Sequence, residues 1–208
     1  MKRRLITFEG SEGCGKTTQI ALLKKRLEAR GEKVVVTREP GGTALGEAIR
    51  HLLKDAPEGR GMSSATELLL FSASRAELID KVILPALTRL DWVLCDRFTD
   101  STLVYQGMAR RLPEATIDPI NHAATSGIKP GLTLVLDLPL EKAAARLRTR
   151  ATKDRFEEED ETFFTRVKDG FLQLAKKEPE RIKVVDADAP PEVVAGEVWK
   201  HFTEAFAL

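Results

Sequence analysis

The sequence contains few cysteines, since Cys14 and Cys95 are the only two in 208 residues. Two cysteines cannot build a disulfide scaffold, and these two lack the spacing of a zinc site. We therefore expect both thiols to be reduced, which favours a cytoplasmic protein. Neither cysteine stands in surroundings that would lower a thiol pKa, so the sequence does not predict a redox switch.

Long hydrophobic runs and an excess of charge of one sign are also missing. The apolar run that begins at Leu5 ends at Phe8, which is much too short for a signal peptide or a membrane-spanning helix. The 33 basic residues nearly balance the 32 acidic ones, whereas proteins that bind nucleic acid polymers usually carry a basic excess. We therefore expect neither a membrane nor a nucleic acid polymer among the partners.

The amino-acid composition is typical of one globular domain, which we expect to span residues 1–208. Hydrophobic residues make up 42% of the chain and charged residues 31%, as in ordinary globular proteins. A chain of this length can bury its own core without disulfides. No repeat of fixed period and no low-complexity block occurs in the sequence, so a solenoid is not expected.

Apolar runs that suggest strands alternate with helical patterns along the chain. Such alternation requires crossover connections, which produce a parallel sheet with helices on both faces. The sequence therefore predicts an α/β fold. The expected strands are Leu5–Glu9, Lys33–Thr37, Trp92–Cys95, Leu132–Leu136 and Ile182–Val185.

Two helix starts can be predicted in detail. Thr43 is the expected N-cap of a helix whose apolar residues recur at steps of three and four, the pattern of one buried stripe. Ser64 and Glu67 have the spacing of a capping box and are expected to open a long helix. The expected stripe after Thr43 consists of Leu45, Ala48, Ile49, Leu52 and Leu53.

A glycine-rich phosphate-binding motif directly follows the first expected strand. Residues 10–17 satisfy the pattern GxxxxGK[ST] and open a helix, which is the context that makes a chance match improbable. Lys16 would reach the β- and γ-phosphates of a nucleotide, and the Thr17 hydroxyl would bind Mg²⁺. The expected ATP-binding residues are Gly10, Ser11, Glu12, Gly13, Cys14, Gly15, Lys16, Thr17 and Thr18.

A second residue for the magnesium site is expected at the carboxyl end of another apolar strand. Asp96 follows the strand Trp92–Cys95, and Arg97 would bring a phosphate-binding cation into the same cleft. An isolated Asp-Arg pair is as easily an exposed ion pair. The phosphate-binding motif makes the functional interpretation the better one.

Phosphate-binding loops occur in GTPases, ATPases and small-molecule kinases alike. The guanine signature Asn-Lys-x-Asp is absent from the sequence, and motors and helicases are normally larger. Arginines recur instead at the ends of expected elements, which indicates that two sets of phosphates are held in one cleft. These are Arg38, Arg75, Arg97 and the basic group from Arg146 to Arg155.

Taken together, the motifs resemble those of the bacterial thymidylate kinases. The resemblance rests on FEGSEGCGKTT at residues 8–18, TREPGGT at 37–43, FSASR at 71–75 and DRF at 96–98. It continues through residues 101–102, 105–107 and 154–157, and so covers most of the chain in order. The family implies a P-loop kinase fold with a five-stranded parallel sheet, a homodimer, and Mg²⁺-dependent transfer of the γ-phosphoryl group of ATP to dTMP in dTTP synthesis.

The resemblance also implies roles at the acceptor site. Phe71 and Arg75 match residues that stack on thymine and hydrogen-bond its O4, and their spacing puts both on one helix face. Without the resemblance, Phe71 would be assigned to the core. The other implied acceptor-site residues are Arg38 and Arg97 for the phosphate, Glu12 for the 3′-hydroxyl, Thr102 and Gln106 for the base edge, Tyr105 for the 2′ position, and Pro40.

A basic lid segment is expected at about residues 146–160. Eukaryotic members of the family tend to carry an arginine inside the phosphate-binding loop, whereas residues 11–14 contain none. We expect the lid to supply this cation from Arg150 or, as second choice, Arg146, alongside Lys16 and Arg97 as catalytic residues. A solvated basic surface is the alternative for this segment.

The expected reaction needs no general base, because the attacking phosphate oxygen is already an anion. Two other functions remain open from the sequence. A deoxynucleoside kinase would need an acidic base near a hydroxyl, for which Glu9 is available. A nucleotide-binding regulator would act on no second substrate.

Overall fold

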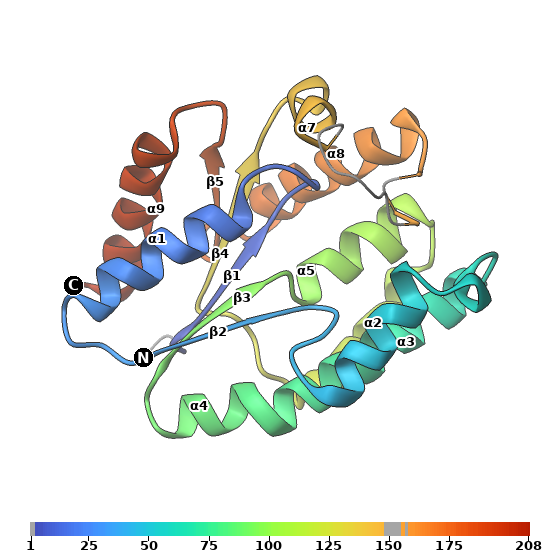
Figure 1. Ribbon diagram of the computed structural model, residues 1–208, viewed down its shortest axis with the longest axis horizontal. Coiled ribbons are helices and arrows are strands. Elements are labelled where there is room, and N and C mark those ends of the chain that lie inside the picture. Colours follow the sequence, from blue (N-terminus) through green and yellow to red (C-terminus); the bar gives the residue numbers. More distant parts are fainter. Residues whose placement is uncertain (1–2, 148–154, 157) are drawn as a thin grey trace.

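The structure, a computed structural model, describes residues 3–147, 155–156 and 158–208. Within them, five strands form a single parallel sheet in the order β2-β3-β1-β4-β5 (Figure 1). The predicted α/β fold with a five-stranded parallel sheet is confirmed. The strands are β1 (Leu5–Glu9), β2 (Val34–Arg38), β3 (Trp92–Asp96), β4 (Leu132–Asp137) and β5 (Ile182–Asp186).

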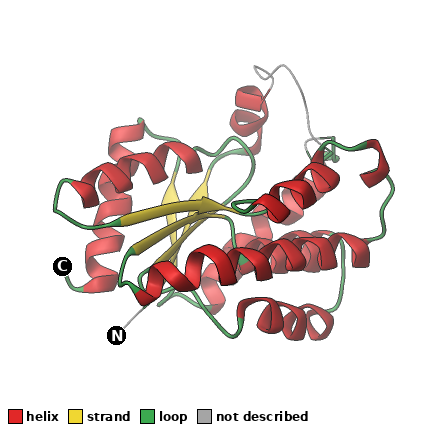
Figure 2. Cartoon of the chain, turned by 60° about the horizontal axis from the view of Figure 1, so that its bottom comes forward, coloured by secondary structure: helices red, strands yellow, loops and turns green. Residues whose placement is uncertain are grey.

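Helices connect the strands and cover both faces of the sheet (Figure 2). None of the helices in the described ranges is long and apolar enough to cross a membrane. The α-helices are α1 (Lys16–Glu28), α2 (Ala44–Lys54), α3 (Ser64–Leu78), α4 (Leu84–Thr88), α5 (Thr99–Thr102), α6 (Glu114–Thr125), α7 (Leu140–Leu147), α8 (Glu161–Lys177) and α9 (Pro191–Phe206). A 3₁₀ turn η1 (Pro57–Gly59) and two π-helical segments, η2 (Ile79–Ile83) and η3 (Leu103–Ala109), complete the elements.

Side chains of β1 alternate between the two faces and explain why both must be covered. Ile6 and Phe8 join a core with α1 and α9, whereas Leu5 joins a second core with the end of α3. Strands buried on both faces are almost continuously apolar. This is why short apolar runs identified the strands to within a residue.

The pairing of β1 with β3 positions the functional site. Phe8 lies opposite Asp96 in the parallel register. The carboxyl ends of parallel strands meet at one edge of the sheet. The loop at residues 10–15 and the segment at 97–102 therefore leave the sheet side by side.

The predicted capping box of the long helix is wrong by one residue. Ser63 is the N-cap of α3, and its hydroxyl accepts a hydrogen bond from the Thr66 N–H at 3.1 Å. Ser63 and Ser64 are equally good N-caps by residue type, so the packing of the helix decides which of them caps it. Glu67 does not cap the helix but is buried, 1% exposed, and pairs with Arg110.

The predicted stripe on α2 is only partly buried. Thr43 caps the helix as expected, since its hydroxyl accepts from the Gly46 N–H at 3.0 Å. Leu53 is fully buried, but Leu45 is 54% exposed and Ala48 is exposed as well. In the single chain, the first half of the stripe therefore has an unpartnered apolar surface.

The helical segment α5–η3 was not among the expected elements. Its residues 99–109 mix polar and apolar side chains without a clear helical period. The segment packs against α6 and α8, and π-helical turns of this kind are often found at functional sites.

Candidate functional site

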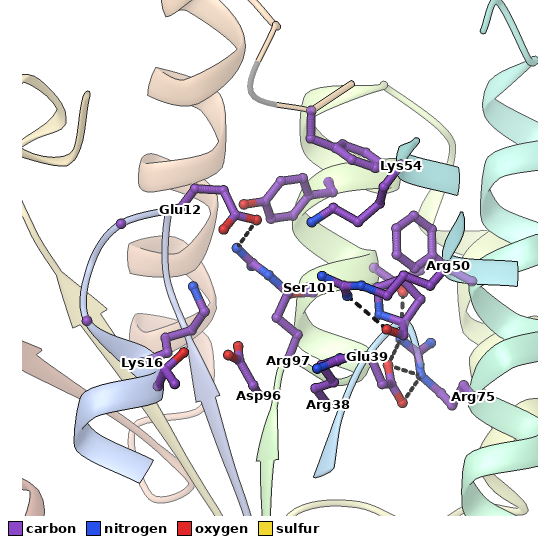
Figure 3. Close-up of a pocket in the computed structure, with 18 of the residues that line it drawn as sticks. Glu12, Lys16, Arg38, Glu39, Arg50, Lys54, Arg75, Asp96, Arg97 and Ser101 are labelled. Carbon is purple, nitrogen blue, oxygen red and sulfur yellow. Dashed lines mark hydrogen bonds and ion pairs between the residues drawn. The ribbon is translucent and has the colours of Figure 1, made fainter. Parts of the chain in front are cut away.

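A cavity of about 290 Å³ lies at the edge of the sheet where β1 and β3 end. Figure 3 shows side chains from the loop after β1, the end of β3 and the helices α2 and α3 around it. Many of the site residues expected from the sequence line it, namely Glu12, Gly13, Gly15, Lys16, Thr17, Thr18, Arg38, Pro40, Phe71, Arg75, Asp96, Arg97, Thr102, Tyr105, Gln106 and Arg146.

The phosphate-binding loop depends on glycine conformations. Gly10 and Gly15 have φ values of 126° and 101°, in the region that favours glycine. A Cβ atom at Gly10 would lie 2.5 Å from the carbonyl oxygen of Leu136. Lys16 begins α1, and its Nζ donates to the carbonyl oxygen of Ser11 at 2.9 Å. Gly10 and Ser11 thus shape the loop and do not line the cavity.

Thr17 and Asp96 face the same cavity from α1 and β3. The close-up places Asp96 between Lys16 and Arg97 (Figure 3). No group of three or more carboxylate, imidazole or thiol side chains among the described residues could hold a metal alone. A hydroxyl and one carboxylate suit Mg²⁺, which takes its other ligands from phosphates and water.

Arg97 is held in the cavity by its backbone and by two side chains. Its φ of 69° is left-handed, which is rare for a side chain of this size. Its Nη2 donates to Glu12 Oε1 at 3.0 Å, and its guanidinium lies 5.0 Å from the centre of the Tyr105 ring. Burial alone would raise the pKa of Glu12, but Arg97, together with Lys16 and Lys54, holds it well below its ordinary value.

Arg75 is fixed by a buried network rather than free in the cavity. Its side chain is 1% exposed, and its Nη2 donates to Glu39 Oε2 at 2.6 Å. Nη1 donates to Asn121 Oδ1 at 2.6 Å, and Nη2 also donates to the Thr102 hydroxyl at 2.9 Å. Any group that meets Arg75 in the cavity therefore meets a preorganised guanidinium.

Sequence reasoning missed several lining residues. Arg50 and Lys54 lie four residues apart on α2, and Arg50 Nη1 donates to the Pro40 carbonyl oxygen at 2.9 Å. Cations on an amphipathic helix usually face solvent, so only their spacing could have indicated a shared site. Phe156 packs edge-on against Phe71 with ring centres 5.8 Å apart. The missed residues are Glu39, Arg50, Lys54, Ser101 and Phe156.

Of the two arginines expected from the lid, the structure describes only Arg146. Arg146 is exposed, and its Nη1 donates to the Gly13 carbonyl oxygen at 3.2 Å. Arg150 lies outside the described residues. A second hollow of about 330 Å³ continues from the loop past Arg146. It is lined by Gly13, Cys14, Gly15, Thr18, Gln19, Arg146, Ala187, Ala189, Pro191 and Val194.

Glu9 is fully buried and has a structural role. Its carboxylate accepts from the Phe98 N–H at 2.8 Å and from the Ser101 hydroxyl at 2.6 Å. It is not among the residues that line the cavity. Burial and then the nearby Asp100 carboxylate raise the pKa of Glu9 to about 8, against the opposing charge of Arg97.

Comparisons with known proteins cover nearly the whole chain. A family model described as thymidylate kinase matches residues 8–198. Thymidylate kinase of Methylococcus capsulatus is 47% identical over 191 residues, which are 92% of this chain and 90% of that protein. Thymidylate kinase of Synechococcus sp. (strain JA-3-3Ab) is 52% identical over 194 residues, 93% of this chain and 92% of that protein. The crystal structure of thymidylate kinase from Ehrlichia chaffeensis has a TM-score of 0.79 and 37% identity, over 95% of this chain and 97% of that chain.

We expect Glu9→Gln to change how stability depends on pH. The pKa of Glu9 is raised from 4.5 to about 8 in the folded protein, so ionising it opposes folding. Its contribution to stability is full below pH 4.5 and is lost as the pH rises toward about 8. Glutamine retains an acceptor for the Phe98 N–H without the charge. The melting temperature of the variant, relative to the wild type, should rise between about pH 5 and about pH 9.

Glu192→Gln is the control for this experiment, because Glu192 is exposed on α9. Its melting temperature should follow the wild type across the same range. A constant difference between Glu9→Gln and the wild type would contradict the raised pKa.

Proposed function

This chain belongs to the thymidylate kinase family, and we propose that it transfers the γ-phosphoryl group of ATP to dTMP, giving ADP and dTDP for dTTP synthesis. One observation carries this proposal. The phosphate-binding loop with Lys16 and the pair Phe71 and Arg75 line a single cavity, with Arg97 among them. The arrangement suits a donor phosphate at one end and a pyrimidine base at the other.

ATP would bind with its phosphates on the glycine-rich loop. Backbone N–H groups and the start of α1 favour anions there, and Lys16 would reach the β- and γ-phosphates. The hollow beyond Gly13 is lined largely by small and apolar side chains such as Ala187 and Val194, which suits the adenosine. Mg²⁺, held by Thr17 and through Asp96, would neutralise charge on the phosphate oxygens.

dTMP would bind in the other part of the cavity. Arg97 and Arg38 would hold its phosphate, since guanidinium groups pair well with phosphate oxygens. Phe71 would stack on the base, and Arg75 would donate to its O4. The remaining acceptor contacts that we propose are Glu12 with the 3′-hydroxyl, Thr102 and Gln106 with the base edge, Tyr105 near the 2′ position, and Pro40.

Catalysis would rest on positioning and charge. An oxygen of the dTMP phosphate attacks the γ-phosphorus in line, without a general base. Both oxygens of the Glu9 carboxylate are already engaged by Phe98 and Ser101, so a hydroxyl-activating base, as in a deoxynucleoside kinase, is not favoured. Arg146 and Arg150 are our candidates for the cation that meets the transferring group.

We further propose a cytoplasmic homodimer. Leu45 on α2 and Leu69 on α3 are 54% and 57% exposed, and these two helices pack against each other. Exposed apolar surface on two packed helices can serve as a subunit contact. Cys14 and Cys95 are free thiols, which agrees with a reducing compartment.

A direct assay tests the proposed reaction. ADP release from MgATP is measured with dTMP, with thymidine and with no acceptor. The proposal requires release that depends on dTMP. ADP release that occurs with thymidine but not with dTMP would identify a nucleoside kinase. Nucleotide binding without ADP release would identify a regulator.

Replacement of Lys16 should remove catalysis and leave the fold intact. Its ammonium serves charge that develops in the transition state, so Lys16→Ala should lower kcat by at least about 100-fold. Lys24→Ala is the matched control on the same helix, where Lys24 pairs with Glu28 on the surface. Steady-state kinetics that find normal turnover in Lys16→Ala would refute the assignment of the loop.

Arg146 should affect turnover more than acceptor binding. If it meets the transferring phosphoryl group, Arg146→Ala should lower kcat by about 100-fold while KM for dTMP changes little. Lys142→Ala is the control, because Lys142 lies one turn away on α7 and pairs with Asp188. Equal kcat values for the two variants would mean that Arg146 is a solvated surface residue without a role in catalysis.

A further inference from the structure

Glu67 is a buried carboxylate that the proposed mechanism does not use. Its side chain is 1% exposed. Gln106 Nε2 donates to Glu67 Oε1 at 2.8 Å. Arg155 Nη2 lies 2.8 Å from Glu67 Oε2, and Arg110 Nε lies 3.3 Å from Oε1. Glu67 is therefore enclosed by two guanidinium groups and one amide.

These partners determine which way the Gln106 amide faces. A guanidinium only donates hydrogen bonds, so Glu67 meets Arg110 and Arg155 as a carboxylate, which has acceptors and no donor. Gln106 can pair with such a group only through its NH2. Its Oε1 accepts no hydrogen bond from the residues that the structure describes. Because Gln106 lines the cavity, the cavity receives an acceptor at this position.

Arg75 presents the opposite kind of group to the same cavity. Its Nε and Nη2 are engaged by Glu39. Its Nη1 gives one hydrogen bond to Asn121, which leaves one Nη1 hydrogen. An acceptor at Gln106 and a donor at Arg75 match the N3–H and O4 of thymine. Cytosine has the reverse pair, a ring-nitrogen acceptor and an amino donor.

We propose that Glu67 is a positioning residue that sets the base preference, because it holds the Gln106 amide with its oxygen toward the cavity. The proposal rests on the proposed function, since it takes dTMP as the acceptor. A glutamine without this partner could turn over and offer its NH2 group, which suits cytosine. Against Glu67, the turned amide would place two oxygens together, lose the hydrogen bond to Glu67 and leave the Gln106 oxygen without a donor.

Glu67→Gln reverses this constraint with little change in shape. The oxygen of the new side chain should take the Oε2 position, because two guanidinium nitrogens lie there, Arg155 Nη2 at 2.8 Å and Arg110 Nη2 at 3.4 Å, against one at Oε1, Arg110 Nε at 3.3 Å. Its NH2 then faces Gln106, which can accept that hydrogen bond only through its own side-chain oxygen. The NH2 group of Gln106 consequently turns toward the cavity.

The matched substrates are dTMP and the 5′-monophosphate of 5-methyldeoxycytidine. They share the methyl group, sugar and phosphate and differ only at N3 and C4. In Glu67→Gln, the kcat/KM ratio of dTMP to the cytosine analogue should fall by at least about tenfold. The change should lie mainly in the KM values for these acceptors, and KM for ATP should stay within about twofold.

Glu159→Gln is the matched control variant. Glu159 pairs with the same Arg110, with Oε1 2.6 Å from Nη2, so the variant removes a charge from the same cluster. No hydrogen bond or ion pair joins Glu159 to Gln106 in the described part of the chain. Its substrate ratio should equal that of the wild type. An unchanged ratio in Glu67→Gln, or an equal fall in both variants, would overturn the role of Glu67.

Wild-type activity separates the two proposals. A wild type that does not phosphorylate dTMP would refute the proposed function. Normal wild-type activity with an unchanged ratio in Glu67→Gln would refute only the role of Glu67.

The wild-type protein offers a second measurement if thermal melting shows that Glu67→Gln does not fold. The side-chain amide signals of Gln106, assigned by their loss in Gln106→Leu, should be protected from hydrogen exchange before and after dTMP is added. Protection that appears only with dTMP would mean that the NH2 group faces the base. That result would also overturn the proposal.

Discussion

The parallel pairing of β1 with β3 is the constraint on which the site depends. It sets Phe8 opposite Asp96, so the phosphate-binding loop and the segment after β3 begin next to each other. Glu9 then joins the two segments through the Phe98 N–H and the Ser101 hydroxyl. The left-handed Arg97 lies between Asp96, which pairs with β1, and Phe98, which donates to Glu9. Such backbone strain persists only where the surroundings over-determine it.

Buried ion pairs give the acceptor side of the cavity its rigidity. The Arg75–Glu39 pair is almost fully buried, and Glu67 is buried against the partly exposed Arg110 and Arg155. Pairs of this kind add little net stability compared with apolar packing, because the desolvation of both charges opposes their attraction. They do fix donors and acceptors in one arrangement. A rigid arrangement can distinguish ligands of similar shape by the polarity of their edges.

The strands and the phosphate-binding loop could be predicted because their signals are local. Strand β3 is apolar on both faces, and the loop motif carries its own chemistry in adjacent residues. The N-cap of α3 could not be fixed, since Ser63 and Ser64 are equivalent until Glu67 is known to be buried. The partnership of Glu67 with Gln106 spans 39 residues and depends on how α3 and η3 pack. Arg50 and Lys54 were missed for the same reason, because only the tertiary fold turns that face of α2 toward the cavity.

The Arg75–Glu39 pair also limits which substitutions could make the protein resistant to an inhibitor. Loss of the guanidinium would leave Glu39, 5% exposed, as an uncompensated buried charge, which typically costs about 3–5 kcal/mol. Whole domains are stable by only about 5–15 kcal/mol. A single resistance substitution at Arg75 would therefore threaten folding itself, and a tolerated one would need a second change at Glu39. A compound that depends on Arg75 for binding would meet a high genetic barrier to resistance.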